Sequence, residues 1–106
     1  DNKVLECTSR NIFIVKQGEI FTPPLTKRIL DGVTRRLILN IAKEHNIKTH
    51  EIDITETMLN DADELWVTSS TKEICPITSL NGKIIGTGKV GPMWQKIQEL
   101  YNQQKN

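Results

Sequence analysis

The sequence has little cysteine, little histidine and almost no net charge, and each scarcity narrows what the protein can be. Fourteen basic against thirteen acidic residues give a net charge of +1, which predicts no strongly basic surface for nucleic acid. Cys7 and Cys75 allow one bridge at most, and a reduced, cytosolic thiol pair suits a domain with this much regular structure. Without a Cys-x-x-Cys motif or a close histidine pair, the spacing predicts no metal site. No apolar stretch reaches transmembrane length, and no signal-peptide pattern opens the chain.

The 106 residues, 37% of them hydrophobic, suffice for one domain with a modest core. The chain opens at Asp1 and is strand-like by residues 4–6, so we interpret it as a piece of a longer protein. Neither an internal repeat nor a linker is visible.

Apolar runs and turn residues predict alternating strands and helices. Strands are expected at 4–6, 12–15, Glu19–Thr22, 48–54, Glu64–Thr68 and 74–80, the last broken by Pro76, with a return strand at 83–85. Helices are expected at 33–45, 55–60 and 93–101, followed by a frayed polar tail at 102–106. Because several strands are hairpin-linked while helices lie between others, the pattern predicts an α/β fold with a mixed sheet and packed helices.

The start of the helix at 33–45 carries charge of the wrong sign. Arg35 and Arg36 lie in the first turn, where the helix dipole disfavours cations, while Asn46 suits a left-handed residue at the other end. Free N–H groups, the Thr34 hydroxyl and two cations together favour an anion site. The alternative is a pair of solvated arginines that tolerate a cost of roughly 0.3–1 kcal/mol each.

Three further segments were weighed for chemistry. Gly86-Thr87-Gly88-Lys89 departs from the phosphate-loop spacing and is interpreted as a connection into the last helix. Glu6, at a strand end, is either solvated or paired with a cation such as Arg10 or a cofactor nitrogen. The hydroxyl run 68–71 either forms a turn or donates to phosphate.

Six segments, which follow one another in one unbroken order, carry a resemblance to a known family. They are 6–13, 18–22, 29–35, 62–70, 81–83 and 88–92. Together they resemble the carboxy-terminal domain of the fold-type-IV (class IV) aminotransferases, which depend on pyridoxal 5'-phosphate. The resemblance is closest to the D-amino-acid (D-alanine) branch, and it implies that family's mixed, pseudo-barrel sheet with packed helices.

The resemblance implies a role for each matching residue. Glu6 pairs with the pyridine nitrogen of the cofactor, and Leu30 packs against its ring. The phosphate is held at the helix start and by the hydroxyl run. The implied cofactor-binding residues are Glu6, Leu30, Val33, Thr34, Ser69, Ser70 and Thr71. Cys7 and Arg10 depart from the family pattern beside Glu6, where glycine and a small or polar residue are usual.

The resemblance also implies what surrounds the chain. Residues 1–106 would be the cofactor-binding domain of a cytoplasmic homodimer, with the Schiff-base lysine upstream in an amino-terminal domain and no catalytic residue of its own. The whole enzyme would exchange an amino group between a D-amino acid and a 2-oxo acid, and the fragment alone would be inactive. Neither nucleic acid nor a membrane is an expected partner.

Two alternatives remain at this stage. A branched-chain aminotransferase or an aminodeoxychorismate lyase shares the cofactor residues, although the hydroxyl run 68–71 favours the D-amino-acid branch. A non-catalytic anion-binding or assembly module with the same fold is the second.

Overall fold

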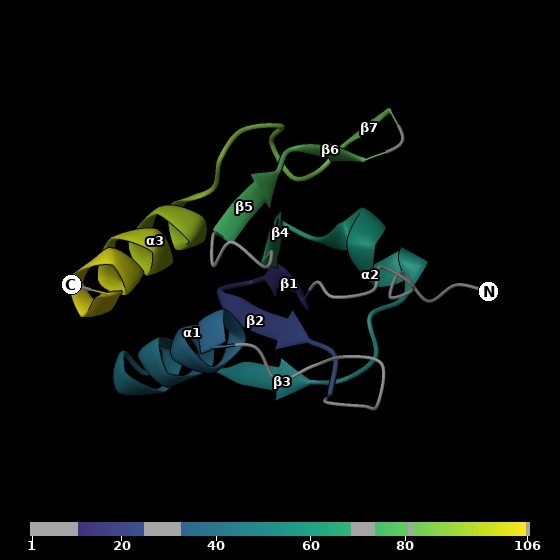
Figure 1. Ribbon diagram of the computed structural model, residues 1–106. Coiled ribbons are helices and arrows are strands. Elements are labelled where there is room, and N and C mark those ends of the chain that lie inside the picture. Colours follow the sequence, from purple (N-terminus) through teal and green to yellow (C-terminus); the bar gives the residue numbers. More distant parts are fainter. Residues whose placement is uncertain (1–10, 25–32, 69–73, 81, 106) are drawn as a thin grey trace.

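The protein is built on a five-stranded mixed sheet with the order β3-β2-β1-β4-β5. Figure 1 shows the computed structural model, which describes residues 11–24, 33–68, 74–80 and 82–105. Among the described strands of this sheet, β2 and β3 are the one parallel pair, so the predicted mixed sheet is confirmed. The strands are β1 (Asn11–Lys16), β2 (Glu19–Thr22), β3 (Thr49–Glu51), β4 (Glu64–Thr68) and β5 (Ile74–Ile77), with a separate hairpin of β6 (Ser79–Leu80) and β7 (Lys83–Ile84).

The central strand is β1, which explains its continuous apolar run. Its neighbours β2 and β4 cover both edges, and both of its faces are packed, so its first five residues are all buried. The predicted hairpin to β2 is confirmed. Gln17 and Gly18 adopt φ values of 52° and 78°, and such positive values match the right-handed twist of paired strands.

Helices α1 (Val33–Glu44) and α3 (Pro92–Lys105) cover one face of the sheet (Figure 1). Their apolar sides join alternate residues of the strands in one cluster. That cluster contains Phe13, Val15, Ile20, Ile38, Ile41, Ala42, Trp66, Ile74, Ile97 and Tyr101. The short helix α2 (Glu56–Asp61) and Ile85 cover the opposite face, where Ile12, Ile14, Ile54, Leu59, Ala62 and Leu65 form a second cluster.

The predicted left-handed residue after α1 is confirmed, and α2 has a side-chain cap at its start. Asn46 follows α1 with φ of 61°, in the left-handed conformation that asparagine tolerates. Thr55 caps α2, since its hydroxyl accepts a hydrogen bond from the backbone N–H of Met58 at 3.2 Å.

The prediction that Pro76 breaks its strand is wrong. Pro76 lies inside β5 opposite Trp66, and the strand ends only after Ile77. In the described sheet β5 is an edge strand, and a proline is tolerated there because one side of the strand has no partner to receive an N–H.

The prediction of a seven-residue strand at 48–54 is also wrong. Only Thr49–Glu51 pairs with β2, and Ile52, expected on a buried face, is 44% exposed. As an edge strand β3 needs few residues, and it is held by the His50 ring, which stacks on Phe21 with centroids 4.6 Å apart.

The last helix is longer than its apolar positions suggested. It continues to Lys105, so the prediction of a frayed tail is wrong. A hydrogen bond of 3.0 Å from Gln98 to Asn102 connects successive turns and supports the polar extension.

The predicted strand at 4–6 lies outside the described residues. Within the described part of the chain, no helix is both long and apolar enough to cross a membrane. The same residues contain no cluster of three or more acidic, histidine or cysteine side chains suited to a metal ion.

Candidate functional site

One end of the sheet collects most of the buried polar side chains. Six polar or charged residues are buried in the described part of the chain: Asn11, Thr22, Thr34, Arg35, Glu64 and Thr68. Asn11 begins β1 and lies directly opposite Thr68, the last residue of β4. Thr22 ends β2 beside them, and its hydroxyl donates to the Ile12 carbonyl at 2.7 Å. Glu64 alone of the six lies at the far end of β4. We call the end at Asn11 and Thr68 the polar end of the sheet.

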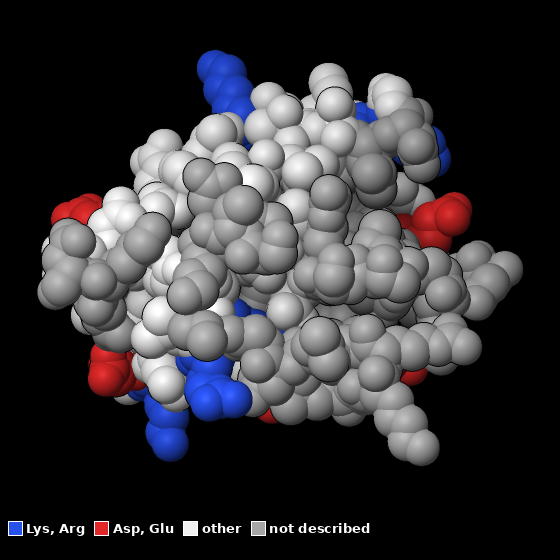
Figure 2. Space-filling view, viewed as in Figure 1, with Lys and Arg blue, Asp and Glu red and all other residues white. Residues whose placement is uncertain are grey.

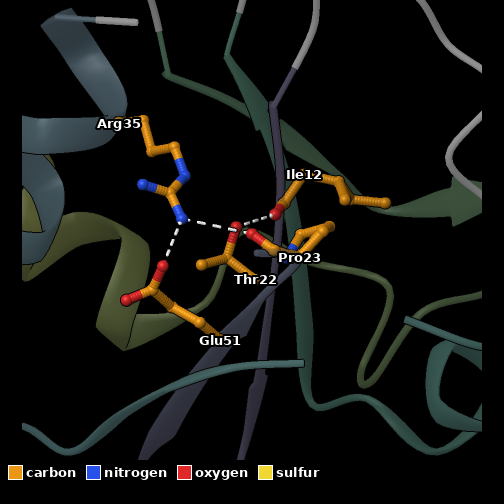
Figure 3. Close-up of polar contacts among 5 residues, drawn as sticks. All are labelled: Ile12, Thr22, Pro23, Arg35 and Glu51. Carbon is orange, nitrogen blue, oxygen red and sulfur yellow. Dashed lines mark hydrogen bonds and ion pairs between the residues drawn. The ribbon is translucent and has the colours of Figure 1, made fainter. Parts of the chain in front are cut away.

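Arg35 attaches the first turn of α1 to this polar end. Its side chain points from the helix toward the sheet (Figure 3), and Nη2 donates to the Pro23 carbonyl at 3.1 Å and to the Glu51 carboxylate at 2.8 Å. Arg35 is buried, whereas the side chain of Glu51 is half exposed. The structure therefore gives this arginine a carboxylate partner that offsets its unfavourable charge at a helix start.

Thr34 lies in the same first turn and is 5% exposed. Its hydroxyl oxygen is 3.3 Å from the hydroxyl oxygen of Tyr101, and either group has the geometry to donate. The first turn contains no acidic residue, and the leading N–H groups of a helix have no partner within the helix. A hydroxyl and such N–H groups at a helix start fit the phosphate of the predicted cofactor, because both donate to an acceptor-only anion.

Asn11 adds a further polar group at this end. Its Oδ1 atom is buried and has no hydrogen-bond partner among the described residues. A buried acceptor that makes no hydrogen bond costs about 1–3 kcal/mol. The Asn11 Oδ1 atom is therefore available to accept a hydrogen bond from a donor at the polar end.

The described residues include two of the seven predicted site residues. Val33 is the first residue of α1, where its backbone N–H belongs to the leading turn, and Thr34 follows it. The other five lie outside the described residues: Glu6, Leu30, Ser69, Ser70 and Thr71. Asn11 pairs with Thr68. Asn11 directly follows segment 1–10 and Thr68 directly precedes segment 69–73, so the described residues that flank these two segments lie side by side.

Sequence reasoning missed three features of the site and its supports. Tyr101 ends the helix predicted at 93–101, but the contact of its hydroxyl with Thr34, 67 residues away, was not predicted. Glu51 lies in the strand predicted at 48–54, and its pairing with Arg35 was not predicted. Glu64, read as part of a core strand, accepts hydrogen bonds from the start of α3. Only the misplaced charge of Arg35 gave a sequence signal that an acidic partner was needed.

A groove lies at the end of the sheet opposite the polar end. Val15, Gly18, Glu64, Met93 and Lys96 are among the side chains and backbone that line it. Of the predicted site residues that the structure describes, neither Val33 nor Thr34 lines this groove.

The described surface carries both signs of charge. In Figure 2 lysine and arginine atoms and aspartate and glutamate atoms are both visible near the outline of the molecule, and neither sign is confined to one side of the view. This distribution agrees with the net charge of +1.

Comparison with known proteins places the chain in a family. A family model described as amino-transferase class IV matches residues 1–80. The chain belongs to the class IV aminotransferase family. That assignment confirms the resemblance found in the sequence, and the fold agrees with it.

Individual class IV aminotransferases match over nearly the whole chain. The D-alanine aminotransferase of Bacillus licheniformis is 40% identical over 98 residues, which cover 92% of this chain and 35% of that protein. The branched-chain amino acid aminotransferase of Escherichia coli superposes with a TM-score of 0.84 at 37% identity, over 90% of this chain and 32% of its own. A T.th. branched-chain amino acid aminotransferase, solved with N-(5'-phosphopyridoxyl)-L-glutamate, gives 0.83 at 28% identity, over 90% of this chain and 32% of its own. The chain thus spans about a third of the length of the relatives it matches.

Proposed function

We propose that residues 1–106 are the carboxy-terminal, cofactor-binding domain of an aminotransferase that uses pyridoxal 5'-phosphate. The observation that carries this proposal is the gathering of buried polar residues at one end of the sheet, with Thr34 among them in the first turn of α1. Thr22, Thr34 and Arg35 are hydrogen-bonded within the domain, whereas the buried Oδ1 atom of Asn11 has no hydrogen-bond partner among the described residues. Membership of the class IV family supports a cofactor as the ligand of this polar end.

The residues of this chain would bind and orient the cofactor. The backbone N–H groups of Val33 and Thr34 and the Thr34 hydroxyl donate to the phosphate at the positive end of the helix dipole. The hydroxyls of Ser69, Ser70 and Thr71, which follow directly after Thr68, complete the set of donors. These donors fix the phosphate end of the cofactor and leave its ring to the other residues.

Glu6 and Leu30 would act on the ring. The Glu6 carboxylate holds a proton on the pyridine nitrogen, and Leu30 packs against the ring face and excludes water from it. When bound, pyridoxal phosphate supplies the electron sink that makes transfer of an amino group feasible. A lysine from the amino-terminal part of the whole enzyme would complete the site, and a homodimer in the cytoplasm is its expected form.

The amino donor is proposed to be a D-amino acid of the D-alanine type, with a 2-oxo acid as acceptor. The hydroxyl run 68–71 and the 40% identity to a D-alanine aminotransferase support this choice. The second candidate is a branched-chain aminotransferase, favoured by the 37% identity and close superposition with the Escherichia coli enzyme. An aminodeoxychorismate lyase remains an alternative of the same fold.

The donor is tested by assaying the whole enzyme with D-alanine and, separately, with a branched-chain amino acid, each with the same 2-oxo acid. Amino transfer from D-alanine at a rate well above that from the branched-chain donor is expected. The reverse order would replace the first candidate with the second.

The phosphate site is tested by combining Thr34→Ala with Ser70→Ala in the whole enzyme. The double variant is expected to lose the visible absorbance of bound cofactor during gel filtration, since donors on both sides of the phosphate are removed. Thr57→Ala, at an exposed position of α2, is the control and should retain the cofactor. Full retention of cofactor by the double variant would refute the phosphate assignment.

A further inference from the structure

A polar contact joins the last turns of α3 to the first turn of α1 within an apolar cluster. The ring of Tyr101 belongs to that cluster, which also contains Ile38 and Ile97. Its hydroxyl oxygen lies 3.3 Å from Oγ1 of Thr34, and the two residues are 2% and 5% exposed. Because little water reaches this contact, the two hydroxyls serve each other as hydrogen-bond partners.

The chemistry of a phosphate group fixes the direction of this hydrogen bond. A hydroxyl has one proton to donate and two lone pairs that accept. A phosphate dianion only accepts, so a Thr34 hydroxyl that binds it must donate its proton to the phosphate. The hydrogen bond between the two side chains must then run from the Tyr101 hydroxyl to Oγ1 of Thr34.

The contact also selects a side-chain conformation. Threonine in a helix divides between two χ1 rotamers, because its hydroxyl is able to bond to a carbonyl of the preceding turn. A donor held at 3.3 Å by a buried ring favours the one rotamer that places Oγ1 beside it. This restriction lowers the conformational entropy that Thr34 loses when the phosphate binds.

We propose that Tyr101 is a positioning residue for cofactor binding: its hydroxyl donates to Thr34 and directs the Thr34 proton to the cofactor phosphate. The proposal rests on the proposed function of the polar end and adds a helix that the family resemblance did not assign to the site. In this role Tyr101 acts through its hydrogen bond to Thr34 and not by direct contact with the cofactor. The carboxyl-terminal turns of α3 therefore contribute to phosphate recognition.

The test compares pyridoxal phosphate with pyridoxal, which lacks the phosphate, as ligands of the whole enzyme freed of cofactor. Tyr101→Phe keeps the ring in the core and removes only the hydroxyl. It is expected to weaken binding of pyridoxal phosphate by about tenfold, the effect of one hydrogen bond of ordinary strength. Binding of pyridoxal is expected to stay unchanged, because the hydroxyl pair acts on the phosphate alone.

Trp94→Phe is the matched control in the same helix. It removes the indole N–H that donates to the Ile74 carbonyl at 2.9 Å, at the other end of α3. This variant loses a comparable aromatic hydrogen bond, so it is expected to lower the melting temperature without changing the ratio of the two binding constants. Since both ligands are measured on the same variant, that ratio separates phosphate recognition from general stability.

A double-mutant cycle that combines Tyr101→Phe with Thr34→Ala completes the test. In that background Tyr101→Phe should cause no additional loss of affinity, because its only route to the phosphate is gone. Equal losses for both ligands, or an additional loss in the Thr34→Ala background, would overturn the role of Tyr101. Unchanged affinity of Tyr101→Phe together with weaker binding by Thr34→Ala would do the same while leaving the proposed function intact. Unchanged phosphate affinity of Thr34→Ala itself would instead remove the Thr34 assignment.

Discussion

Glu64 shows how a single buried side chain joins distant parts of this fold. Its carboxylate accepts hydrogen bonds from the backbone N–H of Met93 at 2.9 Å and of Trp94 at 2.8 Å, and from the Trp66 indole at 3.1 Å. Helix α3 has no acidic residue in its first turn, so Glu64 provides the negative charge there. Gly91 is required beside it, because a Cβ at that position would collide with the Glu64 side chain.

Replacing Glu64 with glutamine is predicted to lower the free energy of unfolding by about 1–3 kcal/mol. The amide loses the negative charge, and its NH₂ group faces N–H donors that need an acceptor. Urea unfolding of the variant measures the change. Glu99→Gln, at an exposed position of α3, is the control and should stay within about 0.5 kcal/mol of the parent protein. Equal effects of the two variants would contradict the capping role of Glu64.

At the scale of the element, helix α2 depends on its cap more than a longer helix would. It has six residues and contributes Leu59 to the second apolar cluster. So short a helix is marginal by itself, and its stability comes from its cap and its packing. Thr55 provides the cap through its hydroxyl.

Thr55→Ala is predicted to lower the free energy of unfolding by about 1 kcal/mol, because the Met58 N–H loses its acceptor. Amide exchange at Met58 should accelerate more than exchange in α1. Thr57→Ala, within the same helix and exposed, is expected to be neutral or slightly stabilising, since alanine has the higher helix propensity. An equal loss of stability in Thr57→Ala would contradict the capping role, because it would show that removing a threonine outside the cap destabilises α2 as much.

The elements that were predicted correctly carry their signals locally. The apolar run of β1, its hairpin link to β2 and the left-handed Asn46 each follow from a few neighbouring residues. The exposure of Ile52 and the place of Pro76 within β5 depend instead on which strands lie at the sheet edges. Edge positions are set by the tertiary arrangement, which a single sequence does not state.

The candidate site also has a part that local sequence predicted and a part that depends on tertiary contacts. The apolar period that begins at Val33 predicted a helix start at Thr34, and the charge of Arg35 and the family resemblance led to the prediction of an anion site at that turn. The partners that fix this turn were not predicted, since Glu51 and Tyr101 lie 16 and 67 residues further along the chain. A long-range contact between ordinary residues leaves no periodic trace in the sequence.

At the scale of the whole molecule, one sheet separates two apolar clusters and belongs to both. Adjacent residues of β1 point to opposite faces, so Phe13 packs in the cluster beneath α1 and α3 while Ile14 packs in the cluster beneath α2. Because β1 contributes side chains to both clusters, loss of packing in one cluster destabilises the strand and thereby the other cluster. We therefore expect the two clusters to unfold as one cooperative unit.

This expectation is tested by truncating one buried side chain in each cluster in turn. Ile38→Ala and Ile54→Ala remove fully buried side chains from opposite sides of the sheet, and each is predicted to lower the free energy of unfolding by about 2–5 kcal/mol. Ile52→Ala, at a side chain 44% exposed, is the control and should cost less than about 1 kcal/mol.

Two probes of each variant decide whether the unit is cooperative. Tryptophan fluorescence reports on the cluster beneath α1 and α3, since Trp66 belongs to that cluster and Trp94 packs against it. Far-ultraviolet circular dichroism reports on all helices and strands. Coincident urea transitions are expected in both core variants, because β1 cannot lose one packed face and keep the other. If Ile54→Ala released part of the dichroism signal at a urea concentration that left the tryptophan signal native, α2 and its cluster would be a separate unit. The polar end would then depend on the α1 and α3 side of the sheet alone, which is the side that holds Thr34 and Tyr101.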